Sequence, residues 1–201
     1  MIDAAVPPSP LCGPLHIDVL SLPATDDGAA PPGRIGMTHC PGRCRPDGRG
    51  RDWRRDLAQD VAAIRAAGFG TVLSLVDDAE LASLGAARLP QALQQSGLRG
   101  LRFAIADFGV PDAQALAAWR DVQAQVLARL QSGESVLVHC AAGLGRTGTM
   151  VAVLLKALGD APDVAIDRVR RTRPGTIETE AQARFVHDFD PAPDRAGDRA
   201  R

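Results

Sequence analysis

The sequence predicts an α/β protein in which a central, mainly parallel sheet is flanked by helices. Short apolar runs of strand length alternate with longer segments in which apolar residues recur at helical spacing. After residue 147 the periodic part of the chain is helical only. Alternation of strands and helices is typical of parallel sheets, because consecutive parallel strands need a long crossover connection between them.

Four apolar runs have the length and composition of strands. They are LHIDVLSL, TVLSLV, LRFAIA and SVLVH, which cover residues 15–22, 71–76, 101–106 and 135–139. Helices are expected where apolar residues step by three and four, first at positions 57, 61 and 64 and then from 116 to 130. Glycines at 68 and 133 end these two patterns. Three further helices are expected within residues 147–159, 163–173 and 178–189.

Length and composition favour one globular domain. The chain has 201 residues, 45% of them apolar and 23% charged, with a formal net charge of −1. These values argue against disorder, a membrane protein or a nucleic-acid binder. We expect the domain to span residues 15–190, with a flexible N-terminus at 1–14 and a disordered tail at 191–201. The start of the chain lacks the basic region of a secretory signal, which favours the cytoplasm.

The four cysteines do not form the pattern of a disulfide scaffold. Cys12, Cys40, Cys44 and Cys140 are few and unevenly spaced, and a reducing compartment keeps such residues as thiols. His39, Cys40 and Cys44 lack the second ligand pair that a zinc site needs, so no metal and no other cofactor is expected. Capture of an oxidised Cys140 by Cys40 or Cys44 is an open alternative.

The segment at residues 135–148 contains the strongest candidates for catalytic residues. The run SVLVH is followed by CAAGLGRTG, at residues 140–148, and then by a strongly apolar helical segment. A cysteine with an arginine six residues later arises easily by chance in a chain with 22 arginines. The full string HCxxGxGRTG is far more specific, because its seven specified positions have a chance probability on the order of one in a billion per start.

A glycine-rich turn between a strand and a helix suits an anion. Successive backbone N–H groups of such a turn can point inward, and the helix dipole adds positive potential. We therefore expect the backbone of residues 141–146 to bind phosphate, which means Ala141, Ala142, Gly143, Leu144, Gly145 and Arg146. Arg146 also offers a planar fork for two phosphate oxygens, which lysine cannot match.

The same positive potential favours the thiolate of Cys140, which is the nucleophilic form of cysteine. Cys140 can then attack phosphorus in line and form a cysteinyl-phosphate. The hydroxyl of Thr147 can donate to the thiolate when it leaves, and His139 is expected to order the loop. The alternative for Cys140 is an inert buried thiol at a strand end.

The string HCAAGLGRTG resembles the signature of the Cys-dependent protein tyrosine and dual-specificity phosphatases. With CPGRC, IADFGVPD and RPGTIETEAQARFV the similarity covers most of residues 34–190 and looks greatest to the kinase-associated phosphatase branch and its bacterial homologues. The resemblance implies a protein tyrosine phosphatase-like fold with a P-loop between strand and helix. It also implies a tyrosine or dual-specificity phosphatase that acts on phosphorylated protein or peptide. Lipid-directed relatives tend to carry lysine in the loop, whereas Ala141 and Leu144 stand here.

Two aspartates of IADFGVPD are candidates for the general acid, which must protonate the leaving oxygen. Asp107 directly follows an apolar run and should lie at the carboxyl end of a strand, where α/β sites gather. Asp112 follows a proline and precedes a helical pattern, which is typical of a helix N-cap. The resemblance also implies the aspartate of the IAD match, so we predict Asp107 as the acid.

Gln182 has two interpretations that the sequence leaves open. Thr179 and Gln182 have the spacing of a capping box, so Gln182 can simply close the start of the last helix. The similar glutamine of related phosphatases helps to position the water that hydrolyses the phosphoenzyme, and this role is carried over to Gln182 only by resemblance.

Two clusters of arginine suggest contact with acidic phosphosubstrates. Residues 34–55 hold seven arginines against two aspartates, a local net charge of +5, although such a run is usually a solvated face. The arginines at 168, 170, 171 and 173 suggest the same more weakly. The rival functions are a phosphatase fold that only binds phosphorylated partners, and a sulfur transferase or arsenate reductase. The sequence has no signal for an oligomeric state.

Overall fold

A five-stranded sheet forms the centre of the computed structural model, which describes residues 12–23, 32–47 and 50–191. Its strands are β1 (Asp18–Leu20), β2 (Ile35–Thr38), β3 (Phe69–Ser74), β4 (Arg99–Arg102) and β5 (Ser135–His139). The strand order is β1-β2-β5-β3-β4, with β1 antiparallel to β2 and all other pairs parallel. The expected α/β class with a mainly parallel sheet is therefore confirmed.

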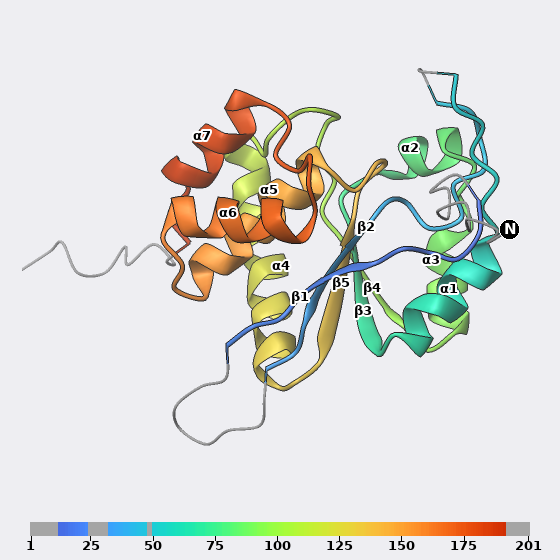
Figure 1. Cartoon of the computed structure of the whole chain (residues 1–201), viewed down its shortest axis with the longest axis horizontal. Helices are drawn as coiled ribbons and strands as arrows, with labels where there is room; N and C mark the ends of the chain where they lie inside the picture. The colour runs from blue at the N-terminus through green and yellow to red at the C-terminus, as the bar shows by residue number, and fades with distance from the viewer. Residues whose placement is uncertain (1–11, 24–31, 48–49, 192–201) are drawn as a thin grey trace, which may run out of the picture.

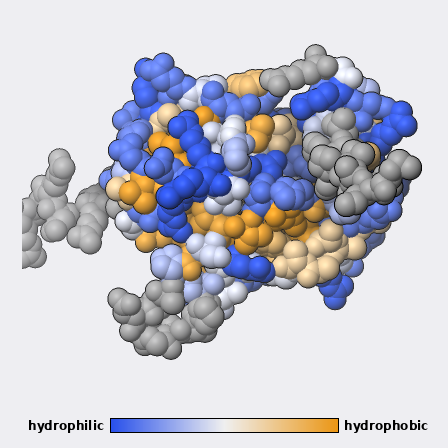
Figure 2. Space-filling view, in the orientation of Figure 1, coloured by the Kyte–Doolittle hydropathy of each residue, from blue (hydrophilic) through white to orange (hydrophobic). Residues whose placement is uncertain are grey.

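Helices cover both faces of the sheet, as Figure 1 shows. One face carries α4 (Ala113–Gln131), α5 (Gly145–Ala157), α6 (Pro162–Thr172) and α7 (Glu180–Asp188), and the other carries α1 (Leu57–Ala66), α2 (Asp78–Ser83) and α3 (Leu89–Gln95). Figure 2 shows mostly hydrophilic residues on the side where β1 crosses the front, with an apolar band through the middle. Among the described helices, none is long and apolar enough to cross a bilayer.

The local sequence explains where several helices begin. The side chains of Asp56, Asp77 and Asp112 each accept a backbone N–H from the first turn of α1, α2 and α4. An aspartate at this position satisfies one of the donors that the first turn leaves unpaired. The capping box of Thr179 and Gln182 at the start of α7 is present with both of its hydrogen bonds.

The central strand β5 and the helix α5 that follows it are the most deeply buried elements. All five residues of β5 are buried, and α5 is buried from Gly145 to Leu155. The connection between them therefore starts and ends in the core, which fixes both ends of the loop at residues 140–144. The carboxyl ends of β2, β3 and β5 lie side by side at this edge of the sheet.

Three elements were absent from the sequence prediction, and three strands differ in extent. One of these is β3, which spans Phe69–Ser74 where residues 71–76 were expected. The strand β2 contains Gly36 and lies in an arginine- and proline-rich segment, so it lacks the usual strand composition. The helices α2 and α3 are six and seven residues long, too short to show a helical period. The expected strand 101–106 is shifted, because β4 ends at Arg102, and only Asp18–Leu20 of the expected strand 15–22 pairs. Most of the predicted terminal segments, residues 1–11 and 192–201, lies outside the described residues.

Gly36 is required by packing across the sheet. A Cβ atom at this position would lie 2.5 Å from Cζ of Phe69 and 2.7 Å from Cδ1 of Leu137, both in the buried core. Such distances are far below van der Waals contact, so a side chain would force the ring of Phe69 to move.

We expect Gly36→Ala to lower the free energy of unfolding by about 1–3 kcal/mol, because overpacking a closed core displaces its neighbours. Gly100→Ala in β4 is the matched control, since a Cβ there would meet only Cδ1 of Leu93, at 3.8 Å. Urea unfolding of both variants measures the difference. Equal stability of the two would contradict this account of β2.

Candidate functional site

A pocket of about 390 Å³ opens where the parallel strands end. Its lining comes from four separated segments, within residues 39–53, 107–108, 140–146 and 173–178. Among the predicted site residues, Cys140, Arg146 and Asp107 all line this pocket. The fold therefore brings together three of the five residues that the sequence predicts to be catalytic, whereas Thr147 and Gln182 are not among the lining residues.

Cys140 lines the pocket with only 3% of its surface exposed. The backbone N–H of Gly143 donates to its Sγ atom at 3.2 Å, so the loop curls around the sulfur. Gly143 has φ +72°, and a Cβ atom there would lie 2.2 Å from the carbonyl oxygen of Thr38. Only glycine fits this turn, because it adopts the left-handed conformation without a steric penalty and leaves room for β2.

The carbonyl groups of the loop are held by donors that surround it. His139 Nδ1 donates to the carbonyl of Cys140 at 3.1 Å. The carbonyl of Ala141 accepts from the backbone of Cys40 and from Arg43 Nη1, both at 3.2 Å. Arg173 donates to the carbonyls of Ala142 and Gly143, at 3.2 and 2.6 Å.

This arrangement orients the opposite side of each peptide. Because the N–H and C=O of one peptide point in opposite directions, carbonyls that are held from outside turn the next N–H groups inward. The N–H of Gly143 shows this directly by its contact with Cys140 Sγ. The positive end of α5 adds to the field of these amides. The loop thus has the geometry of an anion cradle, as expected for residues 141–146.

Arg146 is buried beneath the pocket and fixed by carboxylates. Its side chain is 1% exposed, and both terminal nitrogens donate to the two oxygens of Glu80 at 2.7 Å. Nη1 also donates to the carbonyl of Ile105 at 2.9 Å. Burial alone would lower the pKa of Arg146, but its hydrogen bonds to Glu80 and the nearby Cys140 and Asp107 raise that pKa above its ordinary value. The guanidinium therefore stays charged.

Several buried polar atoms around the pocket have no hydrogen-bond partner within the described residues. Two belong to pocket-lining side chains, Nε2 of His39 and Nε of Arg43, and two belong to α5, Nε of Arg146 and the hydroxyl of Thr147. The last two concern the chemistry. Unpaired buried donors are unusual, since they lose their hydration without compensation. Both belong to the first turn of α5 next to Cys140, so an anionic group in the cradle would suit them.

Two histidines near Cys140 are neutral. Burial, opposed by the hydrogen bond to Cys140 and aided by the charge of Arg146, lowers the pKa of His139 to about 4. Since its Nδ1 donates to a carbonyl, its Nε2 accepts from the hydroxyl of Ser74 at 2.6 Å. Burial, with the charges of Arg55 and Arg173, lowers the pKa of His39 to about 3. His139 thus orders the loop by hydrogen bonds and carries no charge there.

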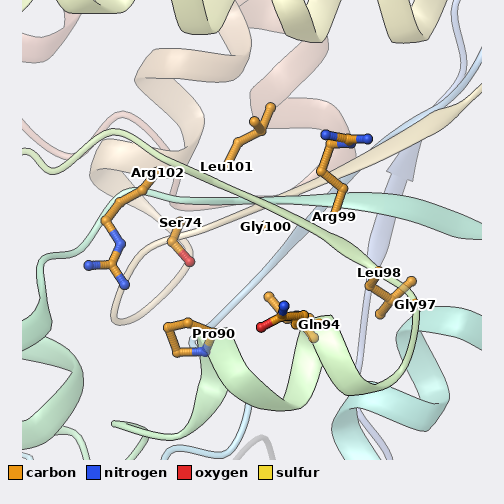
Figure 3. Close-up of a pocket in the computed structure, with 10 residues that line it drawn as sticks. Ser74, Pro90, Gln94, Gly97, Leu98, Arg99, Gly100, Leu101 and Arg102 are labelled. Atoms are coloured by element: carbon orange, nitrogen blue, oxygen red, sulfur yellow. The ribbon is translucent and has the colours of Figure 1, made fainter.

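The hydroxyl of Ser74 also borders a second, larger hollow between α3 and β4. It has about 510 Å³ and is lined by Pro90 and Gln94 of α3 and by the backbone at Gly100, as Figure 3 shows. It contains none of the predicted site residues. We therefore place the chemistry in the smaller pocket, around Cys140.

The two candidate aspartates have different surroundings. Asp107 is 63% exposed on its side chain and lies 2.9 Å from Arg146 Nη2, inside the pocket. Asp107 lies five residues after the end of β4. The chain still runs beside β3 for part of that distance, because the backbone N–H groups of Phe103 and Ile105 donate to the carbonyls of Ser74 and Leu75.

Asp112 is the N-cap of α4 and accepts from the backbone of Ala115 at 2.8 Å. It is not among the residues that line the pocket, so the assignment of Asp107 to the site and Asp112 to the helix start agrees with the geometry.

Gln182 is fully buried and does not line the pocket. Its Oε1 atom accepts from the backbones of Glu178 and Thr179, at 2.9 and 3.3 Å, and its Nε2 atom donates to the carbonyl of Gly109. The side chain from this segment that reaches the pocket is Glu178, whose carboxylate accepts from the backbone of Gly145 at 2.8 Å. The sequence analysis did not single out Glu178, although it lies four residues before Gln182.

Most of the arginines in the two clusters have structural partners. Arg55 binds the buried Asp60, and Arg34 donates to the carbonyl of Ala67. In the second cluster Arg168 binds Asp160, and the rest donate to backbone carbonyls. Of the cluster members that the structure describes, only Arg43, Arg51 and Arg173 line the pocket. Neither whole cluster is therefore a substrate surface, because folding directs most members elsewhere.

The described cysteines are all free thiols. The backbone of Cys40 contacts the loop through Ala141, and its thiol is buried, which raises its pKa. Cys44 donates to the carbonyl of Gly85, in the turn after α2. Over residues 12–23, 32–47 and 50–191, no group of three or more histidine, cysteine or acidic residues has the arrangement of a metal site.

Comparison with known proteins gives matches over most of the chain. A family model described as a Swiss Army Knife protein, DSP-PTPase phosphatase domain, matches residues 54–186. Human cyclin-dependent kinase inhibitor 3 is 29% identical over 180 residues, 88% of this chain and 79% of its own length. Protein tyrosine phosphatase domain-containing protein 1 of the mouse is 37% identical over 131 residues, 61% of this chain and 17% of its own.

Among solved structures, kinase associated phosphatase with serine in place of its catalytic site cysteine is similar, with a TM-score of 0.73 and 27% identity. The similarity covers 88% of this chain and 94% of that one.

Arg173 is a positioning residue whose effect can be measured by binding. We expect Arg173→Met to weaken the binding of inorganic phosphate about tenfold, because two loop carbonyls lose a charged donor and the amides lose their fixed direction. Titration calorimetry measures this affinity. Arg171→Met is the control, since Arg171 donates only to the carbonyl of Asp167 in its own helix. Equal affinities for the two variants would refute the role of Arg173.

Proposed function

Because this chain belongs to the DSP-PTPase phosphatase domain family and is a protein phosphatase, we propose that it dephosphorylates proteins through a cysteinyl-phosphate on Cys140. The observation that carries the proposal is the position of Cys140, which is buried, lines the pocket and has its Sγ atom 3.2 Å from an inward amide. The substrate is a phosphorylated protein or peptide, and the enzyme is a phosphatase of either tyrosine or dual specificity.

In the first step the Cys140 thiolate attacks phosphorus, and the bond to the leaving oxygen breaks. The inward backbone N–H groups of the loop, of which that of Gly143 is one, and the guanidinium of Arg146 hold the non-bridging oxygens, whose charge they stabilise in the transition state. The buried Nε of Arg146, which has no partner within the described residues, is the donor best placed to take one of them. Because these donors already meet the charge of the phosphate, the mechanism requires no metal or other cofactor.

Asp107 supplies the proton to the leaving oxygen. Its carboxyl group lies beside Arg146 in the pocket and is solvent-accessible, so it can exchange protons with water between turnovers. The proton goes to the oxygen of the side chain that departs, which leaves as a neutral hydroxyl.

In the second step water attacks phosphorus and gives a proton to the Asp107 carboxylate that the first step left, while the Cys140–phosphorus bond breaks and inorganic phosphate is released. The hydroxyl of Thr147 donates to the thiolate that re-forms, a role consistent with its buried, unpartnered position. Gln182 holds the backbone of Glu178 and Thr179, and so orients the segment that borders the water's path. Its direct action on the water stays a prediction from resemblance.

Two rival functions are not favoured. A module that only binds phosphorylated partners would not need Asp107 beside Arg146, and the family match is to phosphatases rather than to sulfur transferases or arsenate reductases. We also infer a cytoplasmic location, because the nucleophile must remain a thiol. A bacterial source is inferred from composition, since 22 arginines against one lysine are typical of a GC-rich genome.

Replacement of the nucleophile tests the covalent step. We expect Cys140→Ser to abolish turnover of a small aryl phosphate, because the serine hydroxyl supplies no nucleophilic anion at neutral pH. Binding of vanadate or phosphate should persist, since the amides and Arg146 remain. Cys12→Ser, on an exposed cysteine, is the control. Activity of Cys140→Ser within about tenfold of the wild type would refute the proposal.

The aspartate that donates the proton is identified by leaving-group dependence. We expect Asp107→Asn to reduce turnover by about 10² to 10⁴ on a phosphotyrosine peptide and much less on an activated aryl ester, which needs no proton. Asp112→Asn should leave turnover of both esters unchanged, because asparagine caps a helix nearly as well as aspartate. Steady-state rates of both variants on both esters measure this, and the reverse pattern would exchange the roles.

A further inference from the structure

One wall of the pocket is a stack of two arginines on Trp53. The guanidinium carbon of Arg43 lies 4.3 Å from the ring centroid, and that of Arg51 lies 5.7 Å from it. Asp47 links Arg51 to Trp53, since its carboxylate accepts from the indole N–H of Trp53 at 3.2 Å and from Arg51 Nε at 2.6 Å. We call these four residues, Arg43, Asp47, Arg51 and Trp53, the arginine wall.

The arginine wall is attached to the phosphate loop. Arg43 Nη1 donates to the carbonyl of Ala141, and all four residues line the same pocket as Cys140 and Arg146. A phosphorylated side chain with its phosphorus at Cys140 therefore places the residues next to it in the substrate within reach of this wall.

Arg51 is the exposed cation of the wall. Its side chain is 45% exposed, whereas Arg43 is buried. The Nε and backbone N–H of Arg51 are bound to Asp47, and its two terminal nitrogens have no hydrogen-bond partner within the described residues. These terminal nitrogens form the fork that recognises a carboxylate or phosphate through two parallel hydrogen bonds.

The charge of the wall is not balanced by other carboxylates of the pocket. Two arginines face one aspartate within it. The remaining carboxylates that line the pocket are Asp107, bound to Arg146, and Glu178, bound to the backbone of Gly145. The wall therefore keeps one net positive charge toward the pocket.

We propose that Arg51, held in place by Trp53 and Asp47, recognises an anionic side chain next to the phosphorylated residue of the substrate. The anion is a carboxylate or a second phosphate, which share the two oxygens that the fork requires. The inference rests on the proposed function, because it concerns the substrate of that same site. The stack and the ion pair fix Arg51 before binding, so little conformational entropy is lost when the anion binds.

The test compares peptides that differ only beside the phosphoresidue. One phosphotyrosine peptide carries glutamine at the flanking positions, a second carries glutamate, and a third carries one phosphoserine. We expect wild-type kcat/KM to be about tenfold higher for the glutamate and phosphoserine peptides than for the glutamine peptide, mainly through KM. The advantage should shrink at high salt, because the contact lies at a partly exposed charge.

Variants assign this preference to Arg51. Arg51→Gln should bring the ratio of acidic to neutral kcat/KM close to one, and Arg51→Lys should leave an intermediate ratio, since charge remains without the fork. Arg54→Gln is the matched control, because Arg54 lies in the same segment, is 77% exposed, pairs with Asp52 and is not among the pocket's lining residues. It should keep the full ratio.

The outcomes separate this inference from the proposed function. A wild-type ratio near one, or Arg51→Gln slowing all peptides equally, would overturn the role of Arg51 while leaving the phosphatase mechanism intact. Preference for the phosphoserine peptide alone assigns the anion to a second phosphate, and preference for both assigns it to anions in general. No turnover of any peptide by the wild type, or of a small aryl phosphate, would instead overturn the proposed function.

Discussion

The site depends on the direction of four peptide groups between Cys140 and Leu144. Their carbonyl oxygens are engaged by His139, Cys40, Arg43 and Arg173, which belong to three different parts of the chain. Each engaged carbonyl turns the following N–H toward the pocket. The donors for an anion are therefore preorganised before it binds. The left-handed turn at Gly143 and the burial of β5 and α5 are conditions for the same geometry.

A second condition is the buried charge of Arg146. A guanidinium at 1% exposure is stable only when its hydrogen bonds replace the lost hydration, and Glu80 supplies two of them. The carboxylate also fixes the plane of the guanidinium, so the Nε edge is held toward the loop. Glu80 therefore belongs to the machinery although it does not line the pocket. Its presence at the start of the short helix α2 explains why that element is kept beside the site.

The pocket combines a fixed base with walls from distant segments. The phosphate loop comes from the β5–α5 connection, Asp107 from the segment after β4, Glu178 from the approach to α7, and the arginine wall from the segment between β2 and α1. In a parallel sheet the carboxyl ends of strands meet at one edge, so separate connections converge there. The base is set by backbone geometry, whereas the walls are set by side chains that can differ between relatives without disturbing the fold.

The sequence by itself determined the α/β class, the strand–loop–helix around Cys140, and the separate positions of Asp107 at the pocket and Asp112 at the start of α4. These depend on local pattern: the apolar period, the glycines and the capping residues act over a few positions. The sequence did not indicate β2, whose Gly36 is a weak strand former and is explained only by the ring of Phe69. It also did not indicate Glu80, which is 66 residues from Arg146, or the carbonyl contacts of Arg173, which is 30 residues from Gly143. Only the tertiary structure decided which of the 22 arginines lie at the pocket, because a charged side chain has no local signal for its partner. That choice follows from the packing of distant segments.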